Sequence, residues 1–227
     1  MKLYSMTASG NCYKVAWMLN MLKEPCTIVP TSIVTRETKA PSYLAKNPNG
    51  QVPLLELESE NEKGGTFLAE SNAILLYLAE TNQNFLLPSA NKENYHLLRG
   101  LIYQWLFFEQ YSHEPAIAVR RANLLFHRPC SPEKMKELLE RGYRALDVME
   151  EHFVRNKGDS DYLVGNEFTI ADMALFAYTH VAQKEGGYED MPSRCPNVCA
   201  WIERIKNRED FVEMTKVLEQ TELPLVA

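Results

Sequence analysis

The stretch KLYSMTASGNCYKVAWMLNMLKEPCTIVPTSI, residues 2–33, decides the fold because it predicts a strand, a helix and a second strand in direct succession. Residues 2–6 and 26–33 are typical of strands, and residues 12–22 are typical of a helix. Two strands that a helix connects can pair in parallel, since the chain crosses back along the sheet between them. This stretch therefore predicts the start of a small α/β domain.

The residues that follow complete this first domain. PSYLAK predicts a short helix, VPLLEL and TFLAE predict a hairpin around ENEKGG, and SNAILLYLAETN predicts a closing helix. The resulting order is β-α-β-α-β-β-α, in which a helix joins the first two strands and a tight turn joins the last two. We therefore expect an α/β domain with a mixed sheet over residues 1–82.

From residue 94 onward, long helical periods without strand signals predict a second, all-α domain over residues 93–227. Residues 94–126 carry apolar side chains on more than one face. This pattern predicts a largely buried helix pair, or one long helix bent near Pro115. QNFLLPSANKE, residues 83–93, is the expected linker.

Capping signals mark the other helices of the second domain. Ser131 stands before Pro132 and an apolar-periodic run, as a helix N-cap does. Thr169 and Asp172 have the spacing of a capping box, with Asp in place of the usual Glu or Gln, and we interpret this pair as structural. The helices predicted in this way cover residues 131–156, 169–183 and 196–208.

Composition and charge exclude several classes of function. The 227 residues carry a formal net charge of -6, and apart from VRRAN the Lys and Arg are scattered among Asp and Glu. No basic stripe is present that would bind nucleic acid. The N-terminus has no apolar signal-peptide core, and no stretch approaches the roughly 18 uninterrupted apolar residues of a membrane-spanning helix. We therefore expect a cytoplasmic protein with neither nucleic acid nor a membrane as partner.

The cysteines and histidines do not predict a metal site. The five cysteines form an odd set with irregular spacing, which argues against a disulfide framework and against a zinc ribbon. The five histidines do not pair at metal-ligand spacings either. No metal cofactor is expected.

TASGNCYKV, residues 7–15, offers Ser9, Asn11 and Cys12 as candidates for chemistry. At 100° per residue Cys12 shares the apolar side of the helix with Leu19, so it points inward. Ser9 precedes the first turn, where backbone N–H groups and the positive end of the helix dipole can hold an anion, including a thiolate. Each has a purely structural alternative: Ser9 as a cap, Asn11 bonded to its own backbone, and Cys12 as core.

Two further motifs suggest contacts with a peptide-like ligand. In NPNGQVPLLEL, Pro53 suits a strand start, and a cis Val52–Pro53 bond would turn the N–H and C=O of Val52 toward an extended peptide. A trans proline that merely begins a strand is the alternative. In LAESNAIL, Glu70 and Ser71 precede a helix and suit the ammonium and carboxylate of a zwitterion, although capping explains one of them without function.

Four motifs in register carry a resemblance to one family. SGNCYKV, NPNGQVPLLEL, ESNAILLYLAE and TIADMALF, with the change from an α/β to an all-α pattern, are similar to the cytosolic glutathione transferases. The pattern resembles the serine-type classes, including bacterial and phi/theta-like members. This resemblance implies a thioredoxin-like N-terminal domain followed by an all-α helical bundle.

The resemblance also implies roles for individual residues. Ser9 takes the place of the reactive cysteine of a Cys-x-x-Cys motif, and its hydroxyl donates to the sulfur of glutathione, with assistance from Asn11. The other implied contacts are with the cysteinyl part through the Val52 backbone beside Pro53, with the γ-glutamyl end through Glu70 and Ser71 near Gln51, and with the glycyl carboxylate through Lys39. One departure concerns this last contact, because some serine-type classes have a histidine where this chain has Thr38.

The implied activity is conjugation of glutathione, as co-substrate, to small and mostly hydrophobic electrophiles in detoxification, by a homodimer that uses no metal. The apolar wall of the site for the electrophile, called the electrophile wall below, is expected to include Tyr103, Phe107, Tyr111 and His113. The structural alternative is that these side chains only pack in the core. Two alternatives to conjugation remain open. One is a thiol-disulfide or dehydroascorbate reductase that uses Cys12, and the other is a non-catalytic glutathione-transferase-like binding module.

Overall fold

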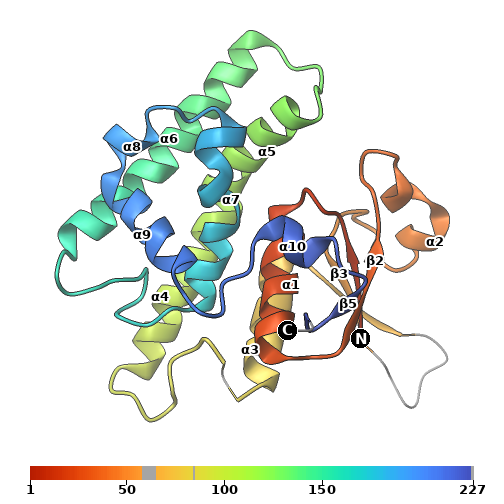
Figure 1. The fold of residues 1–227 in the computed structure, drawn as a ribbon, viewed down its shortest axis with the longest axis horizontal. Coiled ribbons are helices and arrows are strands. Elements are labelled where there is room, and N and C mark those ends of the chain that lie inside the picture. Colours follow the sequence, from red (N-terminus) through yellow and green to blue (C-terminus); the bar gives the residue numbers. More distant parts are fainter. Residues whose placement is uncertain (58–64, 84, 226–227) are drawn as a thin grey trace. The chain divides into compact units, whose positions relative to one another are not determined.

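The structure, a computed structural model, describes residues 1–57, 65–83 and 85–225 and divides the chain into two compact units (Figure 1). The first unit consists of Met1–Phe85 and Asp210–Ala227, and the second of Leu86–Glu209. The segment from Asp210 onward was expected in the all-α domain, but it packs with the first unit.

The first unit is built on a mixed five-stranded sheet, as the order of predicted elements requires. Its strands are β1 (Lys2–Ser5), β2 (Cys26–Pro30), β3 (Leu54–Leu57), β4 (Thr66–Ala69) and β5 (Glu222–Leu223). They lie in the order β4-β3-β1-β2-β5, with β1 and β2 parallel and all other pairs antiparallel. The hairpin of β3 and β4 is confirmed, although most of its predicted turn, ENEKGG, lies outside the described residues.

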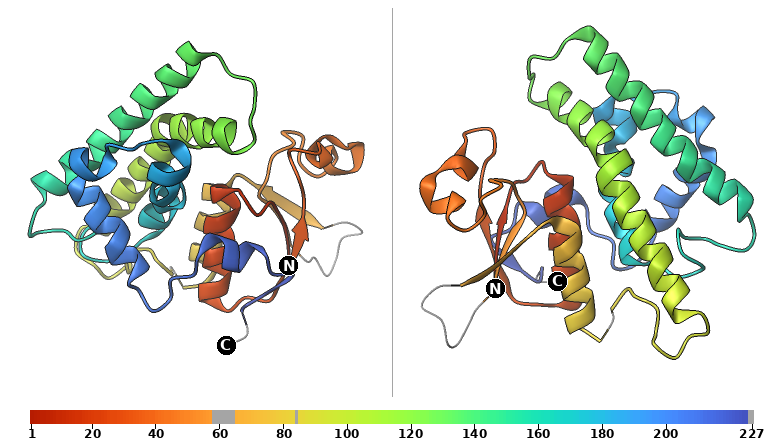
Figure 2. Two further views of the ribbon diagram at one scale, coloured as in Figure 1. Left: turned by 45° about the horizontal axis from the view of Figure 1, so that its top comes forward. Right: turned by 180° about the vertical axis from the view of Figure 1, so that it is seen from behind.

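Helices cover both faces of this sheet. The helices of the first unit are α1 (Gly10–Leu22), the short 3₁₀ turn η1 (Glu37–Lys39), α2 (Pro41–Leu44), α3 (Ser71–Thr81) and α10 (Met214–Leu218). Figures 1 and 2 show α1, α3 and α10 on one side of the sheet and α2 on the other. The thioredoxin-like arrangement therefore places the first turns of α1 and α3 in one layer.

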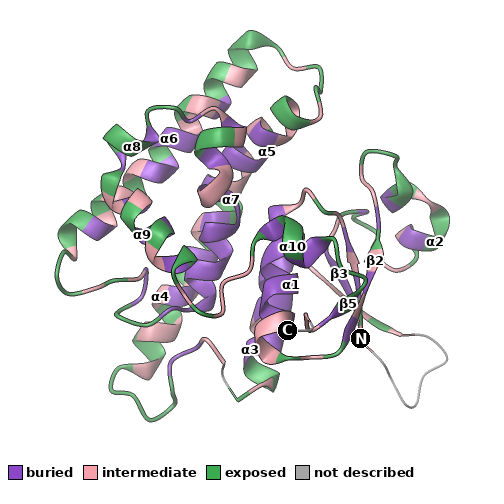
Figure 3. Cartoon of the chain, viewed as in Figure 1, coloured by how far each residue is buried: buried purple, intermediate pink, exposed green. Residues whose placement is uncertain are grey.

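The C-terminal segment holds α1 from the side away from the sheet. The Tyr13 hydroxyl donates to the carbonyl of Val212 at 2.7 Å, and the Trp17 indole N–H donates to the carbonyl of Asp210 at 2.7 Å. The ring of Trp17 also meets Phe211 edge-on at 5.8 Å. Because these contacts cover its outer side, α1 is buried nearly all round rather than along one stripe (Figure 3).

The second unit is all-α, as expected. Its helices are α4 (Tyr95–Phe108), the π-helical turn η2 (Glu109–His113), α5 (Glu114–Leu125), α6 (Pro132–Arg155), α7 (Ile170–Gly186), α8 (Met191–Arg194) and α9 (Pro196–Lys206). Ser131 caps α6 by accepting a hydrogen bond from the backbone N–H of Lys134 at 3.2 Å. Within this unit α7 is the most buried helix and packs against α4, α5 and α9 (Figure 3).

Residues 94–126 form two helices separated near Pro115, as one of the two expectations for this stretch has it, but the predicted burial of the first helix is wrong. The π-helical turn separates α4 from α5, and Pro115 lies in the first turn of α5. In α4 the Leu97 side chain is 61% exposed and that of Phe107 is 74% exposed. Apolar residues on more than one face predict burial, whereas part of the apolar surface of α4 faces outward.

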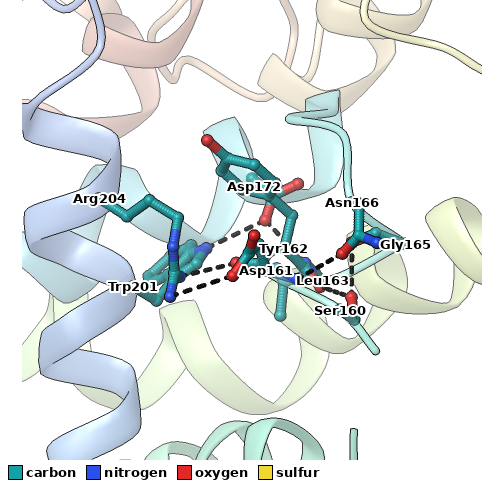
Figure 4. Close-up of polar contacts among 9 residues, drawn as sticks. All are labelled: Ser160, Asp161, Tyr162, Leu163, Gly165, Asn166, Asp172, Trp201 and Arg204. Atoms are coloured by element: carbon teal, nitrogen blue, oxygen red, sulfur yellow. Dashed lines mark hydrogen bonds and ion pairs between the residues drawn. The ribbon is translucent and has the colours of Figure 1, made fainter. Parts of the chain in front are cut away.

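A buried carboxylate fixes the start of α7 (Figure 4). Asp172 accepts from the Leu163 N–H at 2.9 Å, the Trp201 indole N–H at 3.0 Å and the Thr169 N–H at 3.0 Å. The predicted capping box is therefore confirmed, and the Asp at its third position also reaches α9 through Trp201. Arg204, one turn further along α9, bonds the same loop. This carboxylate is structural.

We predict that acid destabilises the second unit through His180. Its ring stacks on Phe176 at 4.5 Å, its Nδ1–H donates to the Phe176 carbonyl at 2.8 Å, and burial lowers its pKa to about 4. Lys206 and Arg121 lower the pKa further in the same direction. The folded protein therefore needs a neutral ring, and its stability is fully present above the unfolded pKa of about 6.5 and is lost as the pH falls toward 4.

From these pKa values, the free energy of unfolding should fall by about 2 kcal/mol at pH 5 and roughly 3 kcal/mol at pH 4. Urea unfolding at pH 7 and pH 5 measures this change. His180→Phe removes the titrating ring, so its stability should depend less on pH by the same amount. An equal loss in the wild type and in His180→Phe would contradict the assignment to His180.

Among the described residues, no helix combines the length and apolar character needed to cross a bilayer.

Candidate functional site

Ser9 caps α1, as its position in the sequence predicts. Its backbone is extended, with φ -93° and ψ 115°, and its Oγ accepts from the Cys12 N–H at 3.2 Å. The Ser9 side chain is half-buried. A hydroxyl both accepts and donates, so this oxygen can keep its cap bond and still donate its own proton to an anion in front of the helix. The positive end of the α1 dipole favours such an anion.

Cys12 is fully buried, which confirms the inward orientation predicted from the helical wheel. Its Sγ accepts from the Met6 N–H at 3.4 Å. Burial raises the pKa of the Cys12 thiol, against the smaller lowering effects of the Ser9 and Met6 hydrogen bonds. A buried thiol held in its protonated form is a poor nucleophile. Cys12 is therefore a core residue in this structure.

Asn11 and Ser71 connect the first turns of two helices. The Ser71 hydroxyl, at the first position of α3, donates to Asn11 Oδ1 of α1 at 3.2 Å. Two helix N-termini therefore meet at this bond, and both point partial positive charge toward the same place. The arrangement can hold carboxylate or thiolate groups next to one another.

Glu70 stands at the N-cap of α3 in an unusual conformation. Its backbone has φ 65° and ψ 110°, and its side chain forms no cap hydrogen bond. The structural alternative, that one of Glu70 and Ser71 is present only to cap α3, is therefore not supported. Glu70 forms no cap hydrogen bond, and the Ser71 hydroxyl donates to Asn11 instead. Positive φ is unfavourable for a residue with a side chain, and such strain is concentrated at functional sites. The Glu70 carboxylate is exposed at the start of α3.

The loop that leads into β3 contains the Val52–Pro53 bond, which is expected to lie against a peptide-like ligand. Tyr43 OH at 2.7 Å and Asn47 Nδ2 at 2.9 Å both donate to the carbonyl of Gln51, which fixes this loop, while the Gln51 side chain is exposed. The Val52–Pro53 peptide bond is cis, and Pro53 is buried. Across the described ranges, no residue forms a hydrogen bond with the Val52 backbone. Its N–H and C=O are thus able to pair with an added extended strand.

Lys39 lies against the same loop. Its Nζ donates to the carbonyl of Asn49 at 3.0 Å. A Cβ at Gly50, whose φ is +62°, would lie 2.8 Å from the Thr38 carbonyl oxygen and 2.6 Å from that nitrogen, so glycine is the residue that this turn accommodates without strain. Thr38 is buried, so the residue that replaces the histidine of some related classes does not offer its side chain to a ligand.

Sequence reasoning missed the contact between Lys14 and Asn72. Lys14 Nζ donates to Asn72 Oδ1 at 2.8 Å, and both side chains are buried. This bond connects α1 to α3 beside the bond between Ser71 and Asn11. The signal that could have found it is the almost unbroken apolar composition of residues 12–22, which is typical of a helix buried on all sides.

The aromatic residues proposed as an electrophile wall do not share one environment. Phe107 and Tyr111 are 74% and 84% exposed, whereas His113 is buried with its Nε2 2.8 Å from the Thr179 hydroxyl oxygen. Tyr103 pairs with Arg99 one turn earlier on α4. The structure therefore does not gather these four side chains into one wall.

No three His, Cys, Asp or Glu side chains of the described residues gather where they could hold a metal ion.

The chain is similar to known proteins over most of its length. Two family models match, Glutathione S-transferase, N-terminal domain, over residues 3–84 and Glutathione S-transferase, C-terminal domain, over residues 110–209. Glutathione S-transferase 3 of Zea mays is 32% identical over an alignment of 219 positions that covers 93% of this chain and 91% of that protein.

Solved structures agree with these matches. The crystal structure of a glutathione S-transferase from Pseudomonas fluorescens has a TM-score of 0.80 at 46% identity and covers 94% of this chain and 98% of that chain. Ure2p in complex with S-hexylglutathione has a TM-score of 0.78 at 26% identity and covers 96% and 97% of the respective chains. A thioredoxin-like unit and a helical unit, matched in order by both family models, assign this chain to the glutathione transferase family.

Proposed function

We propose that the chain conjugates the thiolate of glutathione to small, mostly hydrophobic electrophiles, with Ser9 as the residue that stabilises the thiolate. The observation that carries this proposal is the pairing of a half-buried Ser9 hydroxyl at the N-terminus of α1 with a fully buried Cys12 three residues later. The hydroxyl occupies the place where the helix dipole favours an anion, and the only sulfur of this turn faces the core.

The Ser9 hydroxyl and the α1 dipole can together supply the free energy that is needed to stabilise the thiolate of glutathione. A free thiol with a pKa near 8.5 is only a few per cent thiolate at neutral pH, and lowering that pKa by about two units needs roughly 2.7 kcal/mol. A charge-assisted hydrogen bond from Ser9 contributes about 1.5–3 kcal/mol, and the α1 dipole adds about 0.3–1 kcal/mol. Asn11, held by Ser71, is the proposed helper. The contributions of Ser9 and the α1 dipole together reach the roughly 2.7 kcal/mol that is needed.

The reaction itself is a nucleophilic attack by sulfur. The thiol first releases its proton to solvent, and the thiolate then forms a carbon–sulfur bond with the electrophilic carbon. In a substitution, the leaving group departs with the electron pair of its broken bond. In an addition, the carbanion that forms beside the attacked carbon takes up a proton.

The rest of the glutathione molecule is proposed to lie across the surrounding loops. The backbone of Val52, next to the cis Pro53, would pair with the cysteinyl residue, and Lys39 would meet the glycyl carboxylate from its position over the loop beside Gln51. Glu70 and Ser71 would hold the γ-glutamyl end, the carboxylate of Glu70 meeting its ammonium group. The S-hexylglutathione bound by Ure2p supports a glutathione-type ligand for this fold.

Reduction through Cys12 is less well supported. A mixed disulfide requires a thiolate that solvent can reach, whereas Cys12 is buried and its pKa is raised. Tyrosine-type members of the family use a phenol on the first strand in place of the serine hydroxyl. Tyr4 on β1 is less suited to that role, because its hydroxyl already donates to Glu56 at 2.6 Å.

The test of the proposed function uses the wild-type protein. It should bind glutathione immobilised on agarose, be eluted by free glutathione, and catalyse conjugation to a chlorinated nitroaromatic electrophile at a rate proportional to enzyme concentration. Binding without conjugation over a panel of aromatic halides, epoxides and enals would indicate a binding module instead. A lack of binding would overturn the glutathione site altogether.

We also propose a homodimer in the cytoplasm, with detoxification as its role. The surface that supports it lies on α4 and its π-helical turn, where Phe107 and Tyr111 are four residues apart and largely exposed. Beside them is a hollow of about 360 Å³ whose lining includes Tyr111, Arg141, Arg144 and Val148. In a two-fold dimer the exposed aromatic rings of each copy can fill the hollow of the other.

Phe107→Asp should therefore convert a dimer into a monomer, since it places a charge in the apolar part of this surface. Sedimentation velocity at micromolar concentration measures the mass. Val154 is on the same helix as Val148 and is 54% exposed, but the two side chains point about 120° apart around α6. Val154→Asp is thus the matched control, and an equal effect of both substitutions would argue against this surface.

A further inference from the structure

The carbonyl of Gln51, in the loop that leads into β3, accepts hydrogen bonds from two side chains. Tyr43 OH donates to it at 2.7 Å and Asn47 Nδ2 at 2.9 Å. A carbonyl oxygen has two lone pairs, so the two donors account for its full capacity. Both side chains are buried, which means that they act on the loop rather than on a ligand.

Asn47 holds the loop at three points. Its Oδ1 accepts from the Asn49 N–H at 3.1 Å, its own carbonyl accepts from the Gly50 N–H at 2.9 Å, and its Nδ2 donates to the carbonyl of Gln51. The Asn47 N–H donates in turn to the carbonyl of Tyr43, in α2, at 2.9 Å. Because both ends of the Asn47 amide are engaged, the direction in which Nδ2 meets the carbonyl is fixed.

The peptide group between Gln51 and Val52 passes this hold on to the Val52 N–H. A peptide group is planar, and in the trans form its C=O and N–H point in opposite directions. The peptide bond between these two residues is not one of the cis bonds of the described residues. The Val52 N–H therefore points away from Tyr43 and Asn47, and it turns only if the carbonyl that they hold turns with it.

Hydrogen bonds accepted by a carbonyl also change the other end of its peptide group. They draw electron density toward the oxygen, so the N–H of the same group becomes a stronger donor. The Val52 N–H is one of the two backbone groups proposed above to pair with the cysteinyl residue of glutathione. Tyr43 and Asn47 thus direct this donor and strengthen it.

We propose that Tyr43 and Asn47 are positioning residues that set the affinity for glutathione. They do so by orienting the Val52 N–H through the carbonyl of the residue before it. This inference rests on the proposed glutathione-conjugating function, and it adds to the binding site two residues that do not touch the ligand. A contact with the ligand backbone is the same before and during the attack by sulfur, so weakening it should raise KM and leave kcat unchanged.

Two substitutions remove one donor each. Tyr43→Phe deletes only the hydroxyl, and the carbonyl keeps its bond from Asn47. Asn47→Asp keeps an acceptor for the Asn49 N–H but replaces the donor by a carboxylate oxygen, which repels the carbonyl. We expect Tyr43→Phe to raise KM for glutathione about threefold and Asn47→Asp about tenfold, with kcat and the pKa of the bound thiol close to those of the wild type.

Asn49→Ala is the matched control. The Asn49 side chain is exposed, and the backbone N–H that bonds Asn47 stays in place. Its KM should remain within about twofold of the wild-type value. A fall in kcat equal to the rise in KM in Tyr43→Phe and Asn47→Asp would contradict a role confined to binding.

Three ligands locate the effect at the Val52 N–H when their affinities are measured by calorimetry. γ-Glutamylcysteine lacks the glycyl residue of glutathione but keeps an acceptor oxygen on the cysteinyl carbonyl carbon, and γ-glutamylcysteamine lacks that oxygen as well. Tyr43→Phe and Asn47→Asp should weaken the binding of glutathione and γ-glutamylcysteine by similar factors. The binding of γ-glutamylcysteamine should change less than about twofold, because it has no acceptor at this position.

The other outcomes overturn the inference. An equal weakening of all three ligands would indicate a general loosening of the loop, and a weakening of glutathione alone would indicate an effect at the glycyl end. If the wild type binds glutathione and both variants match its affinity, only the role of Tyr43 and Asn47 fails. If the wild type binds none of the three ligands, the proposed function itself fails.

Discussion

Replacing Ser9 by glycine is expected to lower kcat/KM for glutathione conjugation by roughly 10- to 150-fold with little loss of stability. The activity falls because the variant loses the charge-assisted hydrogen bond to the thiolate, worth about 1.5–3 kcal/mol. The stability is nearly kept because glycine at an N-cap costs only a few tenths of a kcal/mol relative to serine. The measurements are the conjugation rate against glutathione concentration and the midpoint of urea unfolding.

Two further variants show whether the hydroxyl acts on the sulfur or on the helix. Ser9→Ala should lose as much activity as Ser9→Gly but also about 1 kcal/mol of stability, since the Cys12 N–H loses its cap acceptor. Cys12→Ala should keep its activity within about twofold of the wild type, because the buried thiol plays no part in the proposed chemistry. If Cys12→Ala abolished activity while Ser9→Gly retained it, the reductase alternative would be favoured and the role of Ser9 rejected.

Gly142→Ala is expected to destabilise the protein by about 3–4 kcal/mol, although alanine is the better helix former by about 1 kcal/mol. Gly142 lies in the middle of α6, and a Cβ there would lie 1.9 Å from the Tyr188 hydroxyl oxygen and 2.5 Å from the ring carbon that bears it. Tyr188 cannot move easily, because it is buried, donates to the Leu138 carbonyl at 3.2 Å and meets Tyr143 edge-on at 5.1 Å.

The corresponding fall in melting temperature is about 6–16 °C for a chain of this size. Gly100→Ala is the matched control, since Gly100 also lies in a helix interior but a Cβ there meets nothing within 4 Å. It should leave the stability unchanged or raise it by about 0.5–1 kcal/mol. A combined Gly142→Ala and Tyr188→Leu variant should recover part of the loss. A Gly142→Ala protein as stable as the wild type would show that the Tyr188 ring can be displaced at little cost.

The parts of the fold that the sequence could predict are those with strong local patterns. The succession of β1, α1 and β2, the hairpin of β3 and β4 and the long α6 each have enough residues for their periodicity to be recognised. The two-residue strand β5 has no such pattern, and only its pairing with Thr27 and Cys26, almost two hundred residues earlier, makes it a strand. Pairing over that distance depends on tertiary structure, which a local pattern does not contain.

The candidate site divides in a similar way. Ser9 could be located because a serine before a helix has a definite capping geometry, and Cys12 because the wheel gave it an inward angle. The same wheel turns Lys14 about 200° away from Cys12, on the side where a lysine is expected to meet solvent. It is nevertheless buried, because the chain covers both sides of α1. A helical wheel gives relative directions within one helix but not what surrounds it.

The contribution of the segment from Asp210 onward to the first unit has a consequence for how the chain acquires its structure during synthesis. The backbone carbonyls of Asp210 and Val212 and the strand β5 leave the ribosome only after the whole of the second unit. The unit whose translation begins first therefore stays incomplete until the second unit has been made, whereas Leu86–Glu209 is continuous and can reach its final fold earlier. A nascent chain that stops short of Asp210 would leave Trp17 and Tyr13 without these partners and should be recognised and degraded as unfolded.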